Sequence, residues 1–273
     1  MTIGRLERLA RRVSDLPGVW HSRRALHERR VRRGTAWQFW GVFRTRDDAL
    51  KAAHQLGHLP VGYDNPGVAQ RGRETYESFH AFDYPALVWI ARGLEQGGRH
   101  VVDLGGHLGA KFRAYRRVWN FPHDIRWTVC ETSEVVKTSS ELPQHEHPAE
   151  LSFTTDRNCL AEADILFASG VLQYLELPLT AILAGLPSLP RWLVLNKVPL
   201  SDGPEIWTVQ QASGVLVPYH VMNRVAFVDG LKTLGYQVID AWTVAEYAAR
   251  IPFANGYGTT SNSGLALERA RSA

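Results

Sequence analysis

The stretch VVDLGGHLG, Val101 to Gly109, decides the fold of this chain. An apolar run leads to an acid, and three glycines then fall within five positions. Such a run is typical of a buried strand, and glycine is favoured where another group comes close to the backbone. We therefore expect a strand that ends near Asp103, followed by a turn closely approached by a phosphate, a nucleoside or another part of the protein.

The spacing of the glycines excludes the common phosphate-binding turns. Counting from Gly105, a dinucleotide fingerprint needs glycine at the third and sixth positions, where this chain has His107 and Ala110. A Gly-Lys-Ser/Thr sequence, which a P-loop requires, is also absent. The carboxylate of Asp103 would repel a phosphate and attract a cation. The turn therefore indicates a ligand that carries positive charge.

Beyond Gly98, short apolar runs alternate with helical segments. Strands are predicted at 100–105, 126–131, 151–155, 164–169, 192–198, 236–242 and 264–268. Helices are predicted at 110–119, 133–140, 178–186 and 224–235. This alternation is typical of a mostly parallel α/β sheet with helices on both faces, which binds ligands at the carboxyl ends of its strands.

The first third of the chain reads differently, as helices joined by loops. A helix is expected over 45–53 with Thr45 as its N-cap, and another within 79–98. We predict two regions, an N-terminal helical cap or lid over residues 1–95 and a catalytic domain over residues 96–273.

Bulk composition suits a globular protein: of the 273 residues, 45% are hydrophobic and 21% are charged. No apolar run has the length of a membrane span, and the N-terminus has no secretory signal core. Cys130 and Cys159 are expected to be reduced thiols. We expect a cytoplasmic protein without a metal, and homodimer formation is left open.

Positive charge gathers in the first thirty-three residues, which hold ten arginines: Arg5, Arg8, Arg11, Arg12, Arg23, Arg24, Arg29, Arg30, Arg32 and Arg33. An arm of this kind can bind nucleic acid or acidic lipid. However, Ile3, Leu6, Leu9, Val13 and Leu16 recur at helical spacing. A helix that docks its apolar face and turns its arginines to solvent explains the segment better, and nucleic acid is not the expected partner.

The glycine turn resembles the first motif of class I S-adenosylmethionine-dependent methyltransferases, which reads acid-x-Gly-x-Gly-x-Gly after the first strand. His107 stands where the middle glycine usually does. The resemblance implies a Rossmann-like fold and S-adenosylmethionine as the cofactor. It assigns the cofactor contacts of the turn to Asp103, Gly105, Gly106 and Gly109.

Further cofactor contacts follow from the later strands. Glu131, at the end of the second strand, would accept hydrogen bonds from both ribose hydroxyls. Asp156, after the third strand, would contact the adenine amine or serve only as a cap. Ser169 and Gly170, after the fourth strand, would border the methionine part of the ligand.

The chain also resembles a narrower group, a bacterial methyltransferase family associated with polysaccharide or natural-product gene clusters. The resemblance covers roughly residues 37 to 245 and rests on DLGGHLG and on WGVFRTRDDALKAA (Trp40–Ala53), GYDN (Gly62–Asn65), FDYPAL (Phe82–Leu87), SGVLQYL (Ser169–Leu175), VPLSDGPEIWTVQ (Val198–Gln210) and LGYQVIDAW (Leu234–Trp242). It implies methylation of a small molecule or glycan. A similar fold serves azetidine-2-carboxylate synthases, so a cyclase that releases methylthioadenosine is the alternative. A non-catalytic binding module is a third.

The chemistry itself has several candidate residues. Tyr174 is the expected aromatic of the pocket, and Tyr219 and His220 are candidates for the catalytic base, together with His107 and Lys197. Each has a purely structural alternative. In the N-terminal segment, the two lid candidates are Tyr63 and Tyr84.

Overall fold

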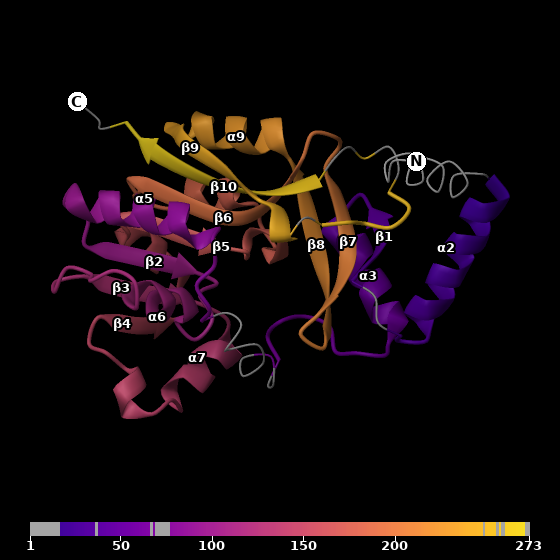
Figure 1. Ribbon diagram of the computed structural model, residues 1–273, viewed down its shortest axis with the longest axis horizontal. Coiled ribbons are helices and arrows are strands. Elements are labelled where there is room, and N and C mark those ends of the chain that lie inside the picture. The colour runs from indigo at the N-terminus through magenta and orange to yellow at the C-terminus, as the bar shows by residue number, and fades with distance from the viewer. Residues whose placement is uncertain are drawn as a thin grey trace, which may run out of the picture.

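The computed structural model describes residues 17–35, 38–65, 68, 77–247, 249–254, 257 and 260–270 (Figure 1). Its helices are α2 (Pro17–Arg32), α3 (Arg46–Leu56), α5 (Asp83–Glu95), α6 (Ala110–Arg116), α7 (Ser133–Ser140), α8 (Leu179–Ala184) and α9 (Arg224–Thr233). Its strands are β1 (Phe39–Phe43), β2 (His100–Leu104), β3 (Arg126–Cys130), β4 (Leu151–Thr154), β5 (Ile165–Ser169), β6 (Trp192–Ser201), β7 (Ile206–Ala212), β8 (Val215–Asn223), β9 (Tyr236–Val244) and β10 (Thr260–Arg269).

The predicted strands form the centre of one sheet. Within the described residues they run in the order β4-β3-β2-β5-β6-β10-β9, with β10 antiparallel to both of its neighbours and the other pairs parallel. The chain moves outward from β2 to β4 and then crosses to β5 on the other side of β2. This reversal creates a switch point at the carboxyl ends of β2 and β5, where ligands bind in sheets of this kind.

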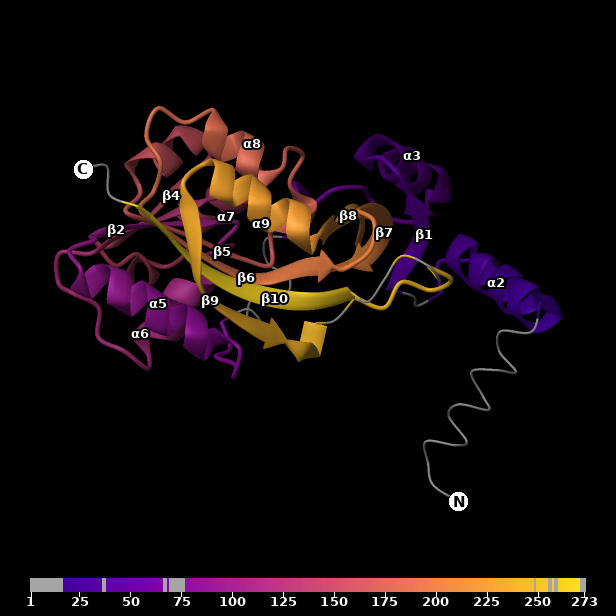
Figure 2. The same cartoon turned by 90° about the horizontal axis from the view of Figure 1, so that it is seen from above.

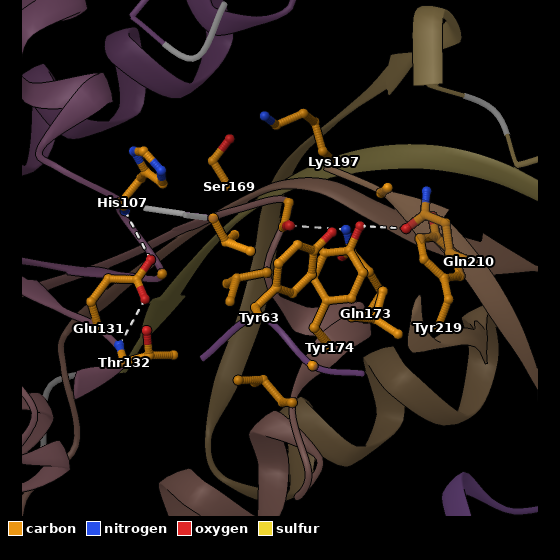
Figure 3. Close-up of a pocket in the computed structure, with 18 of the residues that line it drawn as sticks. Tyr63, His107, Glu131, Thr132, Ser169, Gln173, Tyr174, Lys197, Gln210 and Tyr219 are labelled. Carbon is orange, nitrogen blue, oxygen red and sulfur yellow. Dashed lines mark hydrogen bonds between the residues drawn. The ribbon is translucent and has the colours of Figure 1, made fainter. Parts of the chain in front are cut away.

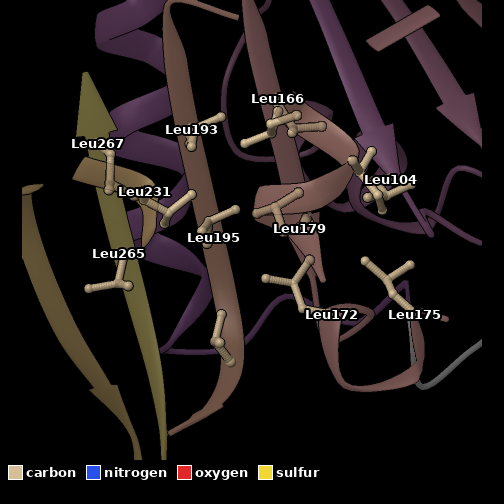
Figure 4. Packing of buried hydrophobic residues seen from close by; sticks show 14 of the residues in the cluster. Leu104, Leu166, Leu172, Leu175, Leu179, Leu193, Leu195, Leu231, Leu265 and Leu267 are labelled. Atoms are coloured by element: carbon tan, nitrogen blue, oxygen red, sulfur yellow. The ribbon is translucent and has the colours of Figure 1, made fainter. Parts of the chain in front are cut away.

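Helices cover both faces of this sheet, as predicted. Helices α5 and α6 lie on one face, and α8 and α9 lie on the other (Figure 2). Successive residues of β2 point to opposite faces of the sheet. Val101 packs in the core beside α5 and α6, the first core, and Val102 packs in the core beside α8 and α9, the second core. Figure 4 shows the second core, which is rich in leucine. Burying each of these side chains contributes about 1.5–3 kcal/mol.

Three strands, β1, β7 and β8, were not predicted. Strand β8 pairs in parallel with the far end of β6, β7 forms an antiparallel hairpin with β8, and β1 pairs with β7. The hairpin turns at Ser213 and Gly214, which both have positive φ, 51° and 74°. Turns of this type match the twist of paired strands. The sheet therefore continues well past the predicted end of β6 (Figure 1).

Strand β1 lies within residues 1–95, where helices joined by loops were expected. Thr45 does cap α3, since its Oγ1 accepts a hydrogen bond from the Asp48 N–H at 3.1 Å. However, α3 packs on β7 and β8, and α5 packs in the central core. The predicted helix around Ile3 and Leu16 lies outside the described residues. No helix in the described ranges is long and apolar enough to cross a membrane.

Candidate active site

A cavity of about 600 Å³ lies at the switch point. The carboxyl ends of β2, β3 and β5, together with Lys197 of β6, form one side of it, and residues of the β7–β8 hairpin and the segment around Tyr63 form the other. Its volume is typical of pockets that take a small molecule. The unpredicted strands therefore supply a wall of the site.

The glycine turn at the end of β2 packs closely against other residues of the protein. Gly105 has a φ of 69°, and a Cβ atom there would overlap the side chain of Val171. A Cβ atom on Gly106 would overlap the carboxyl group of Asp103. Gly109, with a φ of 76°, contacts Leu151 and does not line the cavity. The group that closely approaches this backbone is thus another part of the protein, although Gly105 and Gly106 do line the cavity.

The side chain of Asp103 packs against the backbone of the glycine turn at Gly106. It is 1% exposed, and its Oδ2 accepts a hydrogen bond from Trp127 Nε1 at 3.3 Å. Burial raises the pKa of Asp103 to about 8, against the hydrogen bond from Trp127 and the nearby charges of Lys111 and Lys197, which lower it. At neutral pH this carboxyl group therefore holds its proton more often than a surface aspartate does.

Asp103→Asn should change how stability depends on pH. The folded-state pKa of Asp103 is raised, so the folded protein binds the proton more tightly than the unfolded chain. The free energy of unfolding therefore falls as pH rises toward about 8. The variant lacks this penalty, and its stability relative to the wild type should rise by about 3 kcal/mol between about pH 5 and about pH 7.5. Urea unfolding at both pH values measures it, and an unchanged difference would mean that Asp103 titrates normally.

Glu131 faces the cavity directly after β3 (Figure 3). Its Oε1 accepts a hydrogen bond from the His107 N–H at 3.0 Å, and its Oε2 accepts one from the Thr132 N–H at 2.8 Å. Each carboxylate oxygen can accept a second hydrogen bond. Thr132 Oγ1 also lines the site, is buried and has no hydrogen-bond partner among the described residues. Together the two side chains offer a polar edge to a ligand with hydroxyl groups.

The loop after β5 forms the floor of the site. Ser169 and Gly170 line the cavity, and Gly170 has a φ of 74°. Gln173 Nε2 donates to the Gly170 carbonyl at 2.9 Å. In the described part of the chain, Gln173 Oε1 and Ser169 Oγ are buried without a hydrogen-bond partner. Both oxygens could accept a hydrogen bond from a bound molecule.

Aromatic side chains line the opposite wall. The rings of Tyr63 and Tyr219 lie 4.8 Å and 5.6 Å from that of Tyr174, and all three residues line the cavity. Tyr174 donates its hydroxyl hydrogen to Gln210 Oε1 at 2.7 Å (Figure 3). Burial raises the pKa of Tyr219 well above its usual value, which makes this residue a poor base.

His220 lies outside the cavity lining. It alternates with Tyr219 along β8, so the two side chains point to opposite faces. The His220 ring stacks on Trp207 with centroids 4.1 Å apart, and its Nε2 lies 2.7 Å from Glu205 Oε1. Burial lowers the pKa of His220. These contacts correct the prediction that His220 is a base in the pocket.

Two further candidates also lie outside the lining. Asp156 is exposed and accepts a hydrogen bond from the Asn158 N–H at 2.9 Å, which caps the short helix η2 (Arg157–Glu162). The structure thus shows the capping alternative and no place for Asp156 in the cavity wall. Tyr84 is 58% exposed and contacts Phe79, so of the two lid candidates only Tyr63 reaches the site.

Two lysines in the cavity wall have unlike surroundings. Lys111, which sequence reasoning missed, pairs with the buried Asp83 at 2.8 Å and donates to the Ser78 carbonyl at 3.1 Å. Its position early in α6 gave no signal, since helical lysines usually face solvent. Lys197, a predicted candidate, lies in the middle of β6 and lines the cavity. It contacts the rings of Phe82 and Tyr247 instead of a carboxylate.

No known protein-family profile matches the chain, and no curated protein matches it. Solved structures do resemble it. The [4+2]-cyclase SpnF is 13% identical, with 86% of this chain and 100% of that chain covered and a TM-score of 0.51. The 1,6-didemethyltoxoflavin-N1-methyltransferase of Burkholderia thailandensis is 15% identical, covers 83% and 87%, and has a TM-score of 0.44. The magnesium protoporphyrin IX methyltransferase of Synechocystis PCC 6803 is 12% identical, covers 85% and 86%, and also has a TM-score of 0.44.

Proposed function

From this fold, the Rossmann-like sheet of class I methyltransferases, we propose that the chain is an S-adenosylmethionine-dependent methyltransferase that acts on a small molecule or a glycan. The observation that carries the proposal is the position of Glu131. Its carboxylate faces the cavity at the carboxyl end of β3, beside the glycine turn of β2 and at the switch point of the sheet. A carboxylate in this place is suited to hold the two hydroxyls of a ribose.

The side chains around Glu131 fit the rest of this ligand. Thr132 Oγ1 is an orphaned buried oxygen next to the ribose position. The turn lacks the glycine and lysine pattern of phosphate-binding sites, which suits a ligand without phosphate groups. The rings of Tyr63 and Tyr174 offer faces that tolerate a cation. S-adenosylmethionine supplies an electrophilic methyl carbon, and the chain's residues bind and orient the two reactants and exclude water.

The acceptor side of the cavity supports a small substrate. Its wall consists of Tyr174, Tyr219 and Gln210, which lie on the hairpin or against it, and Tyr63 completes it. An aromatic wall with a few polar groups is typical of sites for small molecules and single sugar units. The likeness to bacterial methyltransferases from polysaccharide and natural-product clusters supports the same class of acceptor.

A cyclase of the azetidine-2-carboxylate synthase type is the second candidate. In such an enzyme the amine of S-adenosylmethionine attacks its own side chain and releases methylthioadenosine. The likeness to the [4+2]-cyclase SpnF supports this alternative, because it indicates that the fold is not restricted to methyl transfer.

Incubation with the ligand alone separates these possibilities. We expect S-adenosylmethionine and S-adenosylhomocysteine to bind in calorimetric titrations, and S-adenosylmethionine to remain intact without an acceptor. Chromatography would detect methylthioadenosine, whose enzyme-dependent release would replace the methyltransferase by the cyclase. If neither ligand binds, both functions are excluded, and salt-sensitive binding to nucleic acid or acidic vesicles would point to a binding module.

A further inference from the structure

An irregularity in the pairing of β6 places Lys197 in the cavity wall. Leu195 pairs with Leu265 and Val198 pairs with Ser263, so two residues of β6 lie opposite the single residue Gly264. Such a bulge redirects a side chain and is common beside active sites. Lys197 itself has a φ of 56°, a left-handed conformation that costs free energy for a residue with a side chain.

The neighbouring Asn196 holds this irregularity in place. Asn196 is fully buried, and its Oδ1 accepts hydrogen bonds from the Lys197 N–H at 3.1 Å and from Trp242 Nε1 at 3.0 Å. Its Nδ2 donates to the Phe82 carbonyl at 3.3 Å. Trp242 in turn packs against Gly264, where any side chain would overlap the indole. Three elements, β10, β9 and the start of α5, thus fix the backbone that aims Lys197.

The ammonium position of Lys197 is close to the floor of the site. A Cβ atom on Gly170 would lie 3.4 Å from Lys197 Nζ, so this nitrogen sits against the loop after β5 (Figure 3). The same nitrogen lies 5.8 Å and 5.4 Å from the ring centres of Phe82 and Tyr247. Among the described residues, no carboxylate lies within ion-pair distance of it.

Charged groups from three elements surround Lys197. Lys111 on α6 opposes its protonation, whereas Asp83 on α5 and Asp103 on β2 favour it. Burial is the largest influence, and the net result is a pKa of Lys197 lowered to about 8. Asp83 is paired with Lys111 at 2.8 Å.

We propose that Lys197 is the general base that removes a proton from a hydroxyl or amine of the acceptor. The proposal rests on the methyltransferase function. When the acceptor's lone pair bonds the methyl carbon, the carbon–sulfur bond breaks and its electron pair stays on sulfur. The acceptor's O–H or N–H proton moves to Lys197 Nζ, so the positive charge lost at sulfur reappears on the lysine.

This charge exchange explains why the lysine has no carboxylate partner. A protonated Lys197 and a sulfonium in one poorly solvated cavity repel each other, so binding of S-adenosylmethionine favours the neutral lysine that a base must be. S-adenosylhomocysteine has no sulfonium and tolerates the protonated form. A permanent ion pair with a carboxylate would keep Lys197 charged and prevent this exchange.

The polar atoms around Lys197 indicate the class of acceptor. Gln173 Oε1 and Ser169 Oγ are buried, lie in the cavity wall and have no hydrogen-bond partner among the described residues. They can accept hydrogen bonds from hydroxyl or N–H groups. A carboxylate acceptor would need no base and would be repelled by Gln173 Oε1, which can only accept, so we infer a hydroxylated or amine-bearing acceptor.

The test compares the affinities of S-adenosylmethionine and S-adenosylhomocysteine at about pH 6.5 and about pH 9, and it needs no acceptor. In the wild type, the affinity for S-adenosylmethionine relative to that for S-adenosylhomocysteine should be about tenfold lower at the lower pH. This factor corresponds to a fall of about one unit in the pKa of Lys197 when S-adenosylmethionine binds. In Lys197→Met the ratio of the two affinities should be the same at both pH values, apart from any change caused by titration of the ligands themselves. Lys197→Arg, which stays charged, should bind S-adenosylmethionine poorly at both pH values. Lys137→Met, a change at an exposed lysine of α7, should match the wild type.

The alternatives give different results. If Lys197 binds the carboxylate that both ligands share, Lys197→Met will weaken both equally, and the base role is overturned. The base role is also overturned if the ratio of the two affinities changes with pH in Lys197→Met as it does in the wild type. If the wild type binds neither ligand, the methyltransferase function fails instead. Circular dichroism and thermal unfolding of each variant check that the fold is retained.

Discussion

Glu131→Ala is expected to weaken S-adenosylmethionine binding at least about a hundredfold. The wild-type carboxylate is placed to accept two hydrogen bonds from ribose hydroxyls, and bonds to a charged group contribute about 1.5–3 kcal/mol each. The substitution also frees the His107 and Thr132 N–H groups that Glu131 now satisfies. Calorimetric titration measures the loss, and Glu141→Ala, at an exposed carboxylate after α7, should leave affinity unchanged.

A ligand that lacks one hydroxyl makes this experiment specific for the ribose. S-adenosylhomocysteine without its 2′-hydroxyl should bind the wild type more weakly than the parent compound. In Glu131→Ala the two ligands should bind alike, because the partner of that hydroxyl is gone. If the two losses are additive, Glu131 does not contact the ribose, and the assignment of the cofactor site to the end of β3 is wrong.

Gly105→Ala should destabilise the protein by about 3 kcal/mol, since two costs act at one position. A residue with a side chain pays about 1–2 kcal/mol for the left-handed backbone, and overlap with a packed neighbour adds about 1–3 kcal/mol. The φ of 69° and the contact with Val171 give the physical basis for both. Urea unfolding measures the total.

Two further variants separate these costs. Gly97→Ala has a φ of 98° and no atom within 4 Å of the added carbon, so it should show the backbone cost alone. Val171→Gly removes the overlapping side chain, and in combination with Gly105→Ala it should recover the packing part. If Gly105→Ala costs no more than Gly97→Ala, the turn has room for a side chain, and its packing against Val171 does not limit it.

Local patterns were sufficient to predict the central sheet. Strands β2 and β5 are short, almost fully buried runs, and Asn223 caps α9 through its side chain. Glu131 and Ser169 could be placed at the site because parallel strands align their carboxyl ends, which follows from the order of elements. These are properties of contiguous sequence, and they do not depend on which distant segment forms the partner.

The remaining features depend on pairing between distant residues. Strand β8 contains Pro218, which argues against a strand, and only its pairing with β6 and β7 decides that Tyr219 faces the cavity while His220 does not. The bulge that aims Lys197 needs Gly264 on β10. The Ser213–Gly214 pair was a usable signal for the hairpin, since Ser-Gly is a common turn dipeptide and glycine readily adopts positive φ.

Strand β1 pairs with β7, and the hydrogen bond from Thr208 Oγ1 to the Trp40 carbonyl joins residues 168 positions apart. A ribosome makes β1 early, but its partner appears only after most of the chain has been synthesised. Pairing across such a long loop is slow, and an unpaired strand edge is exposed in the meantime. The aromatic wall of the cavity can therefore be completed only after most of the chain has been synthesised.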